Sequence, residues 1–216
     1  MSKNNNSDSE NELNITEGEF LVNLARKAIS NYLSENKMIK QPEDTPASLN
    51  EKLGVFVTLK NYNSGELRGC IGFPEPIEIL AKATITSAIE AATGDPRFHK
   101  VTLKELEKDI AVEISVLTVP QEIKTETEDI PRHISIGSDG LIIERGLQRG
   151  LLLPQVAVEW EWDKEEFLAN CCLKAGLPPD SWLLKDSKVF TFKATIFREL
   201  SPKGIVEKVL QEKEPQ

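Results

Sequence analysis

The side chains whose types and spacing most suggest chemistry are an arginine and a cysteine two positions apart, Arg68 and Cys70. The two-residue period of a β-strand places both on the same face of the strand that this stretch predicts. A guanidinium beside a thiol lowers the pKa of the thiol and favours the nucleophilic thiolate. Cys70 is therefore a candidate catalytic residue, and the alternative is a small, buried, structural side chain.

A thiol nucleophile normally works with a positioned histidine. The chain has only two histidines, His99 and His133, and neither lies in a motif that pairs it with Cys70. Anion binding by arginines is therefore favoured over hydrolysis by a cysteine.

Several arginines stand beside glycine or proline at the expected ends of strands and helices, in an otherwise acidic chain. Arginine holds carboxylates and phosphates through paired hydrogen bonds. The alternative for each arginine is an ion pair with Asp95, Glu113 or Glu144. The candidate ligand-binding residues are Arg68, Gly69, Asp95, Arg97 and Arg149.

The charge balance and the apolar pattern exclude several classes of protein. The formal net charge is −9, which argues against the basic stripe expected of a nucleic-acid-binding surface but leaves room for a local basic pocket. No apolar run approaches the roughly 18 residues of a membrane span. The polar, acidic start of the chain does not resemble a secretion signal, and we predict a cytoplasmic protein.

Cysteine and histidine usage argues against metal sites and common cofactors. The three cysteines are Cys70, Cys171 and Cys172, without any Cys-x-x-Cys pair. Zinc and iron–sulfur sites are therefore not expected, and the common nucleotide-binding glycine motifs are missing. We expect no metal and no cofactor. Of the adjacent pair, one cysteine is expected to face the core and the other its margin.

Hydrophobic periodicity predicts a chain of mixed helices and strands. Helical patterns open at a capping box formed by residues 16–19 and recur later in the chain, and a further peripheral helix is expected at 204–213. A glycine-rich hairpin turn is expected at 137–140. The main elements expected are a helix at 20–33, a hairpin of 55–60 with 67–72, a helix at 77–89, a strand at 110–117, a helix at 163–175 and a strand at 189–197.

A short sequence pattern occurs once in each half of the chain. Arg68-Gly69 leads through apolar residues to Pro74 and a helix, and Arg149-Gly150 leads through three leucines to Pro154 and a helix. The order of elements suggests two related halves, although duplication is not established by it. If the halves are related, Arg68 and Arg149 are expected to lie close together where the two halves meet.

With these stretches in view, the chain resembles the AMMECR-type domain family. The motifs that carry the resemblance run over about residues 15–198, in the order that the family shows. They are Leu67-Arg68-Gly69-Cys70-Ile71-Gly72, Asp95-Pro96-Arg97-Phe98, Glu113-Ile114-Ser115-Val116-Leu117, Gly140-Leu141-Ile142, Arg149-Gly150-Leu151-Leu152-Leu153-Pro154-Gln155-Val156-Ala157, Phe167-Leu168, and Lys174-Ala175-Gly176-Leu177 through Trp182. The overall pattern suggests an archaeal member.

The resemblance implies an α+β fold of two related halves that share one curved, barrel-like, mostly antiparallel sheet, with helices outside and two lobes around a cleft. The corresponding organisation is a disordered acidic tail at 1–14, the domain at 15–200 with a lobe boundary near 120–135, and a peripheral tail at 201–216. The family pattern often has proline where this chain has His99, so no family role passes to that residue.

The resemblance does not supply a reaction. It implies Memo-like and radical S-adenosylmethionine proteins as partners in a modification pathway, and the spaced cysteines of a radical enzyme are absent from this chain. Two hypotheses follow. The first is a cleft protein that binds, or acts on, a small anionic ligand. The second is a non-catalytic adaptor. Trp160 and Trp162, two positions apart, either cover the core or form a partner surface. The sequence does not predict the oligomeric state.

Overall fold

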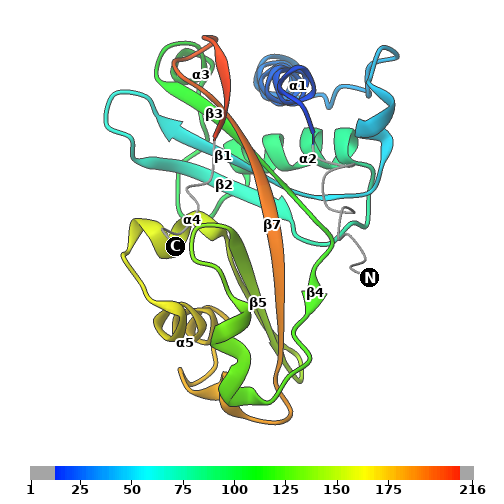
Figure 1. Ribbon diagram of the computed structural model, residues 1–216. Coiled ribbons are helices and arrows are strands. Elements are labelled where there is room, and N and C mark those ends of the chain that lie inside the picture. The colour runs from blue at the N-terminus through cyan, green and yellow to red at the C-terminus, as the bar shows by residue number, and fades with distance from the viewer. Residues whose placement is uncertain (1–12, 210–216) are drawn as a thin grey trace. The chain divides into compact units, whose positions relative to one another are not determined.

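The computed structural model describes residues 13–209, and its ribbon is shown in Figure 1. Most of the acidic tail predicted at 1–14 and the last residues of the chain therefore lie outside the described part. Among the described residues, no helix is both long and apolar enough to cross a membrane.

The chain divides into two compact units. Unit 1 contains residues 13–116 and 195–209, and unit 2 contains residues 117–194. The long strand β7 (Lys188–Glu199) passes from unit 2 into unit 1. The candidate residues of the first motif and of Asp95-Pro96-Arg97-Phe98 all belong to unit 1, whereas Arg149 belongs to unit 2.

Unit 1 is a sheet with helices packed on one face. In strand order, β2, β1, β3 and β7 are neighbours, and β8 pairs antiparallel with β7. The strands are β1 (Gly54–Asn61), β2 (Leu67–Phe73), β3 (Ile110–Leu117) and β8 (Val206–Val209). The helices are α1 (Ile15–Glu35), α2 (Leu80–Thr93) and α3 (Leu103–Lys108), with a short 3-10 helix η1 (Ala47–Asn50).

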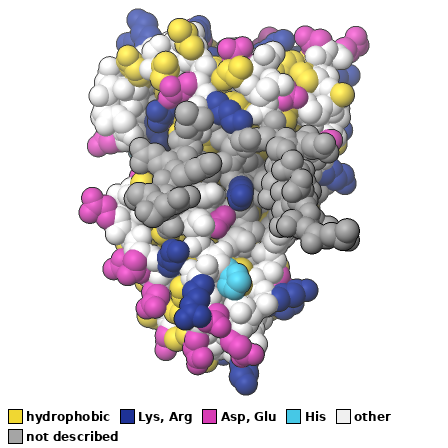
Figure 2. All heavy atoms as spheres, in the orientation of Figure 1, with side chains coloured by type: hydrophobic (Ala, Val, Ile, Leu, Met, Phe, Trp, Pro, Cys, Tyr) yellow, Lys and Arg dark blue, Asp and Glu magenta, His cyan; other side chains and the backbone are white. Residues whose placement is uncertain are grey.

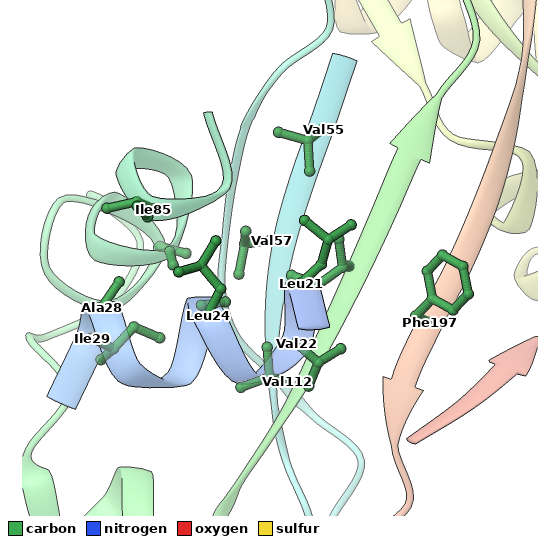
Figure 3. Close-up of a cluster of buried hydrophobic side chains, with 14 of the residues drawn as sticks. Leu21, Val22, Leu24, Ala28, Ile29, Val55, Val57, Ile85, Val112 and Phe197 are labelled. Carbon is green, nitrogen blue, oxygen red and sulfur yellow. The ribbon is translucent and has the colours of Figure 1, made fainter. Parts of the chain in front are cut away.

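The core of unit 1 forms where alternate residues of the strands meet the apolar faces of α1 and α2 (Figure 3). Val55 and Val57 of β1 point toward these helices, so Thr58 and Lys60 belong to the opposite face of the sheet. Gly18 of α1 allows this packing, because a Cβ there would lie 2.0 Å from the ring of Phe197.

A buried ion pair anchors α1 to the end of the sheet. The guanidinium of Arg26 binds the carboxylate of Glu199 and also donates to the carbonyl oxygens of Leu106 and Ile110. Glu199 accepts a further hydrogen bond of 3.0 Å from the backbone N–H of Val112. Every nitrogen of this guanidinium therefore has an acceptor, as a buried charge requires.

Unit 2 repeats the arrangement of a hairpin followed by helices. Strand β5 lies between β6 and β7, and β4 pairs with β7, all antiparallel. The elements are β4 (Gln121–Glu122), η2 (Thr127–His133), β5 (Asp139–Arg145), β6 (Gln148–Leu152), α4 (Pro154–Glu159), α5 (Lys164–Lys174) and η3 (Ser181–Leu183). The predicted α+β class, with antiparallel strand pairs and helices on the outside, is confirmed.

Some local predictions are wrong. The first helix is capped by Asn14, whose side chain exchanges hydrogen bonds with Glu17, and not by a box at 16–19. The turn of the second hairpin lies at Gly146, where φ is +60°, because β5 pairs with β6 and not with residues before 137. Residues 206–209 form a strand where a helix was expected, because their alternation meets the edge of β7.

The adjacent cysteines are also not divided between core and margin. Cys171 and Cys172 are both fully buried in the core of unit 2. Burial raises the pKa of Cys171 to about 12 and also raises the pKa of Cys172. Neither thiol has the properties of a nucleophile.

Candidate functional site

The backbone of Cys70 is held from outside the sheet by two side chains of the segment after α2. Asp95 Oδ2 accepts a hydrogen bond of 2.9 Å from the Cys70 N–H, and Arg97 Nη2 donates one of 3.3 Å to the Cys70 carbonyl oxygen. Strand β2 stands last in the strand order, next to β1 alone. The two side chains thus occupy backbone groups that another strand would otherwise satisfy.

The Asp95 carboxylate is the fixed centre of this arrangement. Its side chain is only 2% exposed, and it receives Arg97 side-on, at 2.9 Å from Nε and 2.7 Å from Nη2. The Arg97 backbone N–H also donates to it. These hydrogen bonds, led by those of the Arg97 side chain, outweigh burial and lower the pKa of Asp95 to about 2.

The Arg97 guanidinium is held in place by Asp95 and is also exposed to solvent. Its side chain is 51% exposed, and its Cζ lies 5.4 Å from the centroid of the Phe98 ring. The hydrogen bond to Asp95 raises the pKa of Arg97, so the group stays charged. Within residues 13–209, Nε and Nη2 have acceptors, whereas Nη1 has none. This nitrogen is the unused donor of the site.

A hollow of about 330 Å³ lies beside this guanidinium, lined by Arg68, Pro96, Arg97, Phe98 and His99. Its walls offer a cation, an aromatic ring and an exposed imidazole. The volume is at the lower end of the range for small-molecule sites.

Arg68 shapes the hollow but has little donor capacity left. Its Nε lies 3.0 Å from Glu105 Oε1, and its Nη1 donates to the carbonyl of His99 at 2.7 Å. Nη2 reaches the carbonyl of Lys100 at 3.4 Å. Burial acts to raise the pKa of Glu105, but hydrogen bonds from Thr102 and Arg68 prevail and lower it. Arg68 therefore joins β2 to α3 and to the segment before it.

A break in the strand register explains why Arg68 and Cys70 do not act together. Leu59 pairs with Gly69 but Lys60 pairs with Leu67, so Arg68 has no partner on β1. Such a β-bulge redirects the side chain at the irregular position. The strict alternation that predicted a shared face ends here.

The Cys70 thiol faces a different set of groups. Thr58, its partner across the hairpin, donates a hydrogen bond of 3.3 Å to Cys70 Sγ. Burial raises the pKa of Cys70, and this effect exceeds the opposing influence of Thr58 and Arg97. The prediction that Arg68 lowers the pKa of this thiol is wrong, because the net shift is upward and Arg68 is not among the groups that cause it. A catalytic role for Cys70 remains a prediction that the electrostatics do not favour.

Gly69 is explained by packing against α2. A Cβ at this position would lie 2.1 Å from the carbonyl oxygen of Ala91. The absence of a side chain allows the strand and the helix to approach closely. A ligand role for Gly69 stays a prediction.

Polar residues of β1 and β3 that are not among the predicted site residues lie on the face of the sheet opposite α1 and α2. Lys60 Nζ lies 3.2 Å from Glu113 Oε2 on the face of the sheet that carries Thr58, and Glu113 is 5% exposed. Ser115, two positions further along β3, is fully buried, and its hydroxyl has no partner within residues 13–209. The two-residue period of β1 and β3 already indicates in the sequence that these side chains share one face.

The comparisons with known proteins agree with one another. The AMMECR1 family model matches residues 22–197. The chain belongs to the AMMECR1 family. It is 56% identical over 194 residues to Protein PH0010 of Pyrococcus horikoshii, covering 88% of this chain and 94% of that protein. It is 52% identical over 200 residues to Protein MJ0810 of Methanocaldococcus jannaschii, covering 92% and 98%.

A solved structure supports the same assignment. The crystal structure of uncharacterized protein PH0010 matches with a TM-score of 0.88 at 55% identity, covering 91% of this chain and 98% of that one. The predicted family is thus confirmed, and these relatives are archaeal proteins. The names of these relatives state no activity.

Within this AMMECR1 domain, Arg149 of unit 2 also precedes a packed glycine and pairs with an acid, but its acid lies on the paired strand and not on a helix as for Arg68. Arg149 Nε lies 3.0 Å from Glu144 Oε1, across the β5–β6 pair. The next residue, Gly150, packs on α5, where a Cβ would lie 2.5 Å from the Ala175 nitrogen. The predicted convergence of Arg149 with the unit 1 residues stays a prediction.

Proposed function

We propose that this AMMECR1 domain binds a small organic anion in the hollow beside Arg97. The observation that carries the proposal is the state of that guanidinium. A buried carboxylate fixes two of its nitrogens, while its third nitrogen and half of its surface remain available. A donor held in place before the ligand arrives loses little conformational entropy on binding.

The lining favours a carboxylate attached to a flat or apolar body over a free inorganic anion. Arg97 Nη1 can donate to a carboxylate oxygen, while Pro96 and Phe98 offer apolar contact to the rest of the ligand. His99 is exposed at the same hollow. Arg68 contributes mainly by holding the wall of the hollow in place, since its nitrogens already have acceptors.

Binding is a better supported activity than covalent catalysis. The raised pKa of Cys70 leaves its thiol protonated near neutral pH, and its backbone is used to anchor the Asp95–Arg97 pair. We therefore assign Cys70 a structural role beneath the site. The place of the domain in a modification pathway, with Memo-like and radical S-adenosylmethionine partners, stays a prediction from the family resemblance.

The charge distribution on the surface is compatible with a small ligand rather than a polyanion. Figure 2 shows acidic and basic side chains interspersed over the face in view. A net charge of −9 opposes the approach of a large anion. A local donor in a hollow can still select a small one.

An NMR titration tests the proposal, with benzoate, acetate and inorganic phosphate as probes. Benzoate is expected to shift the amide resonances of residues 68 and 97–99, with saturation at lower concentration than acetate or phosphate. Arg97→Gln should weaken benzoate binding by about tenfold or more, since a charge-assisted hydrogen bond is lost. Arg97→Lys should recover only part, because an ammonium lacks the planar fork.

Arg198→Gln is the matched control. Arg198 is 47% exposed and pairs through Nε with Glu207 at 2.7 Å, which resembles the setting of Arg97. Benzoate binding should be unchanged in that variant. Equal binding by wild type and Arg97→Gln, with both folded, would refute the proposal.

A further inference from the structure

An exposed pair of stacked tryptophans follows α4 in unit 2. Trp160 is 67% exposed, whereas Trp162 is half-buried against the core of the unit. The ring centroids are 6.1 Å apart, and the ring planes differ by 18°. Trp162 therefore supports Trp160 from below and leaves much of Trp160 open to solvent.

The backbone between the two rings adopts an uncommon conformation. Glu161 has φ +54°, the left-handed region that residues other than glycine rarely enter. Three hydrogen bonds hold it: Trp160 N–H to Val156 O, Glu161 N–H to Val158 O, and Trp162 N–H to Ala157 O at 2.9 Å. Such conformations persist where the surrounding structure enforces them, often at binding sites.

The neighbourhood of the rings is acidic. Residues 158–166 contain five acids and one lysine. Glu159 and Glu161, on either side of Trp160, are exposed, and so is the apolar Val158. An aromatic face carries a partial negative charge, and carboxylates beside it add to the attraction for a cation.

We propose that Trp160, supported by Trp162 and flanked by Glu159 and Glu161, docks an arginine or lysine side chain of a basic segment of a partner protein. Exposed tryptophan with a charged rim is the composition of a binding hot spot. Charge complementarity selects the occupant. A second copy of this chain carries the same net charge of −9, so self-association through an acidic surface is disfavoured. The residues of this surface belong to unit 2, whereas Arg97 belongs to unit 1.

Tryptophan fluorescence with defined peptides tests the inference. The probes are four short peptides of equal length, rich in arginine, lysine, serine or glutamate. The arginine peptide is expected to bind at least tenfold more tightly than the serine peptide, the lysine peptide should bind with intermediate affinity, and the glutamate peptide should not bind. Added salt should weaken the binding. Equal binding of the arginine and serine peptides would overturn the proposal.

Variants separate docking from folding. Trp160→Ala, followed through Trp162 and by calorimetry, should lose at least tenfold in affinity, and Glu159→Gln with Glu161→Gln should lose severalfold. Leu147→Ala is the control, since Leu147 is fully exposed at the turn of the hairpin in the same unit. Loss of binding in Leu147→Ala, unchanged binding in Trp160→Ala, or a dimer that Trp160→Ala dissociates would each contradict the proposal.

Discussion

The two hairpins of the molecule share one construction and differ in one addition. In unit 1, β2 carries Arg68-Gly69, the arginine pairs with an acid, and the glycine packs against the backbone of α2. In unit 2, β6 carries Arg149-Gly150, the arginine pairs with Glu144 of the neighbouring strand β5, and the glycine packs against α5. The repeated Arg-Gly pair is therefore explained by architecture in both units.

The addition is the Asp95–Arg97 pair, which only the unit 1 hairpin has among the described residues. It binds the backbone of Cys70 and presents a partly unused guanidinium beside a hollow. The comparison suggests that the Arg-Gly pair stabilises the fold of each hairpin, whereas the Asp95–Arg97 pair forms the candidate binding site beside the hollow. Substitutions in the two hairpins can test that division.

The largest effect is expected from adding a methyl group at either glycine. Gly69→Ala and Gly150→Ala should each lower the free energy of unfolding by about 3 kcal/mol, because the Cβ meets helix backbone that has no room to move. Urea unfolding measures both. The controls are Gly65→Ala and Gly146→Ala in the two turns, which have open space but positive φ, and should cost about 1 kcal/mol.

If Gly69→Ala were neutral while Gly150→Ala were destabilising, the shared construction would be wrong. Gly69 would then have another function, such as close approach to a ligand.

The next effect separates the two acids. Asp95→Asn should lower stability by about 2 kcal/mol, since a buried carboxylate loses charge-assisted hydrogen bonds. Glu144→Gln should cost less than about 1 kcal/mol, because its ion pair with Arg149 is one-third exposed. Similar losses in the two variants would remove the distinction between the hairpins.

Acid unfolding checks the same carboxylate. The pKa of Asp95 falls from 3.8 to about 2 on folding, so its contribution is complete above pH 3.8 and is lost as the pH falls through about 2. The stability difference between wild type and Asp95→Asn, about 2 kcal/mol at pH 5, should shrink toward zero near pH 2. A difference that is independent of pH would show that the charge of Asp95 is unimportant.

A smaller effect concerns the reactivity of Cys70. Its raised pKa predicts alkylation by iodoacetamide at pH 7 severalfold more slowly than a free cysteine. Thr58→Val, which removes the hydrogen bond to the sulfur, should slow it further. The unfolded chain in guanidinium chloride supplies the reference rate. Alkylation faster than this reference rate would make Cys70 a candidate nucleophile again.

Local features of the fold could be predicted from the sequence, whereas contacts between residues far apart in the sequence could not. Alternation and turn residues identified the hairpin of 55–60 with 67–72, and helical periodicity identified the helix expected at 163–175, which is α5. The bulge at Arg68 depends on the register with β1, which no local pattern encodes. The choice of Glu105 as its partner likewise follows from how α3 packs.

The candidate site shows the same limit. Asp95 and Arg97 were identified by their types and neighbours, but their attachment to Cys70 joins residues 25 or more positions apart. The short stretch at 206–209 was misassigned because four residues fit either period, and pairing with β7 decided between them. Burial, which raises the pKa of Cys70, is a property of the folded chain.

The smallest effect is expected at Arg149. If the site belongs to the Asp-x-Arg pair, Arg149→Gln should change benzoate affinity by less than about twofold, with the protein still folded. The titration that tests Arg97 measures this too. A loss as large as that of Arg97→Gln would instead support a site built from both halves of the chain, as the repeated Arg-Gly pattern of the sequence suggests.

The most direct measurement is a crystal of the protein soaked with 4-bromobenzoate, with the bromine located by its anomalous scattering. We expect a carboxylate about 3 Å from Arg97 Nη1, with the bromine toward Pro96 and Phe98. Crystals of Arg97→Gln should show no such peak. Ligand bound only elsewhere, or bound equally in the variant, would contradict the claim that Arg97 makes the site.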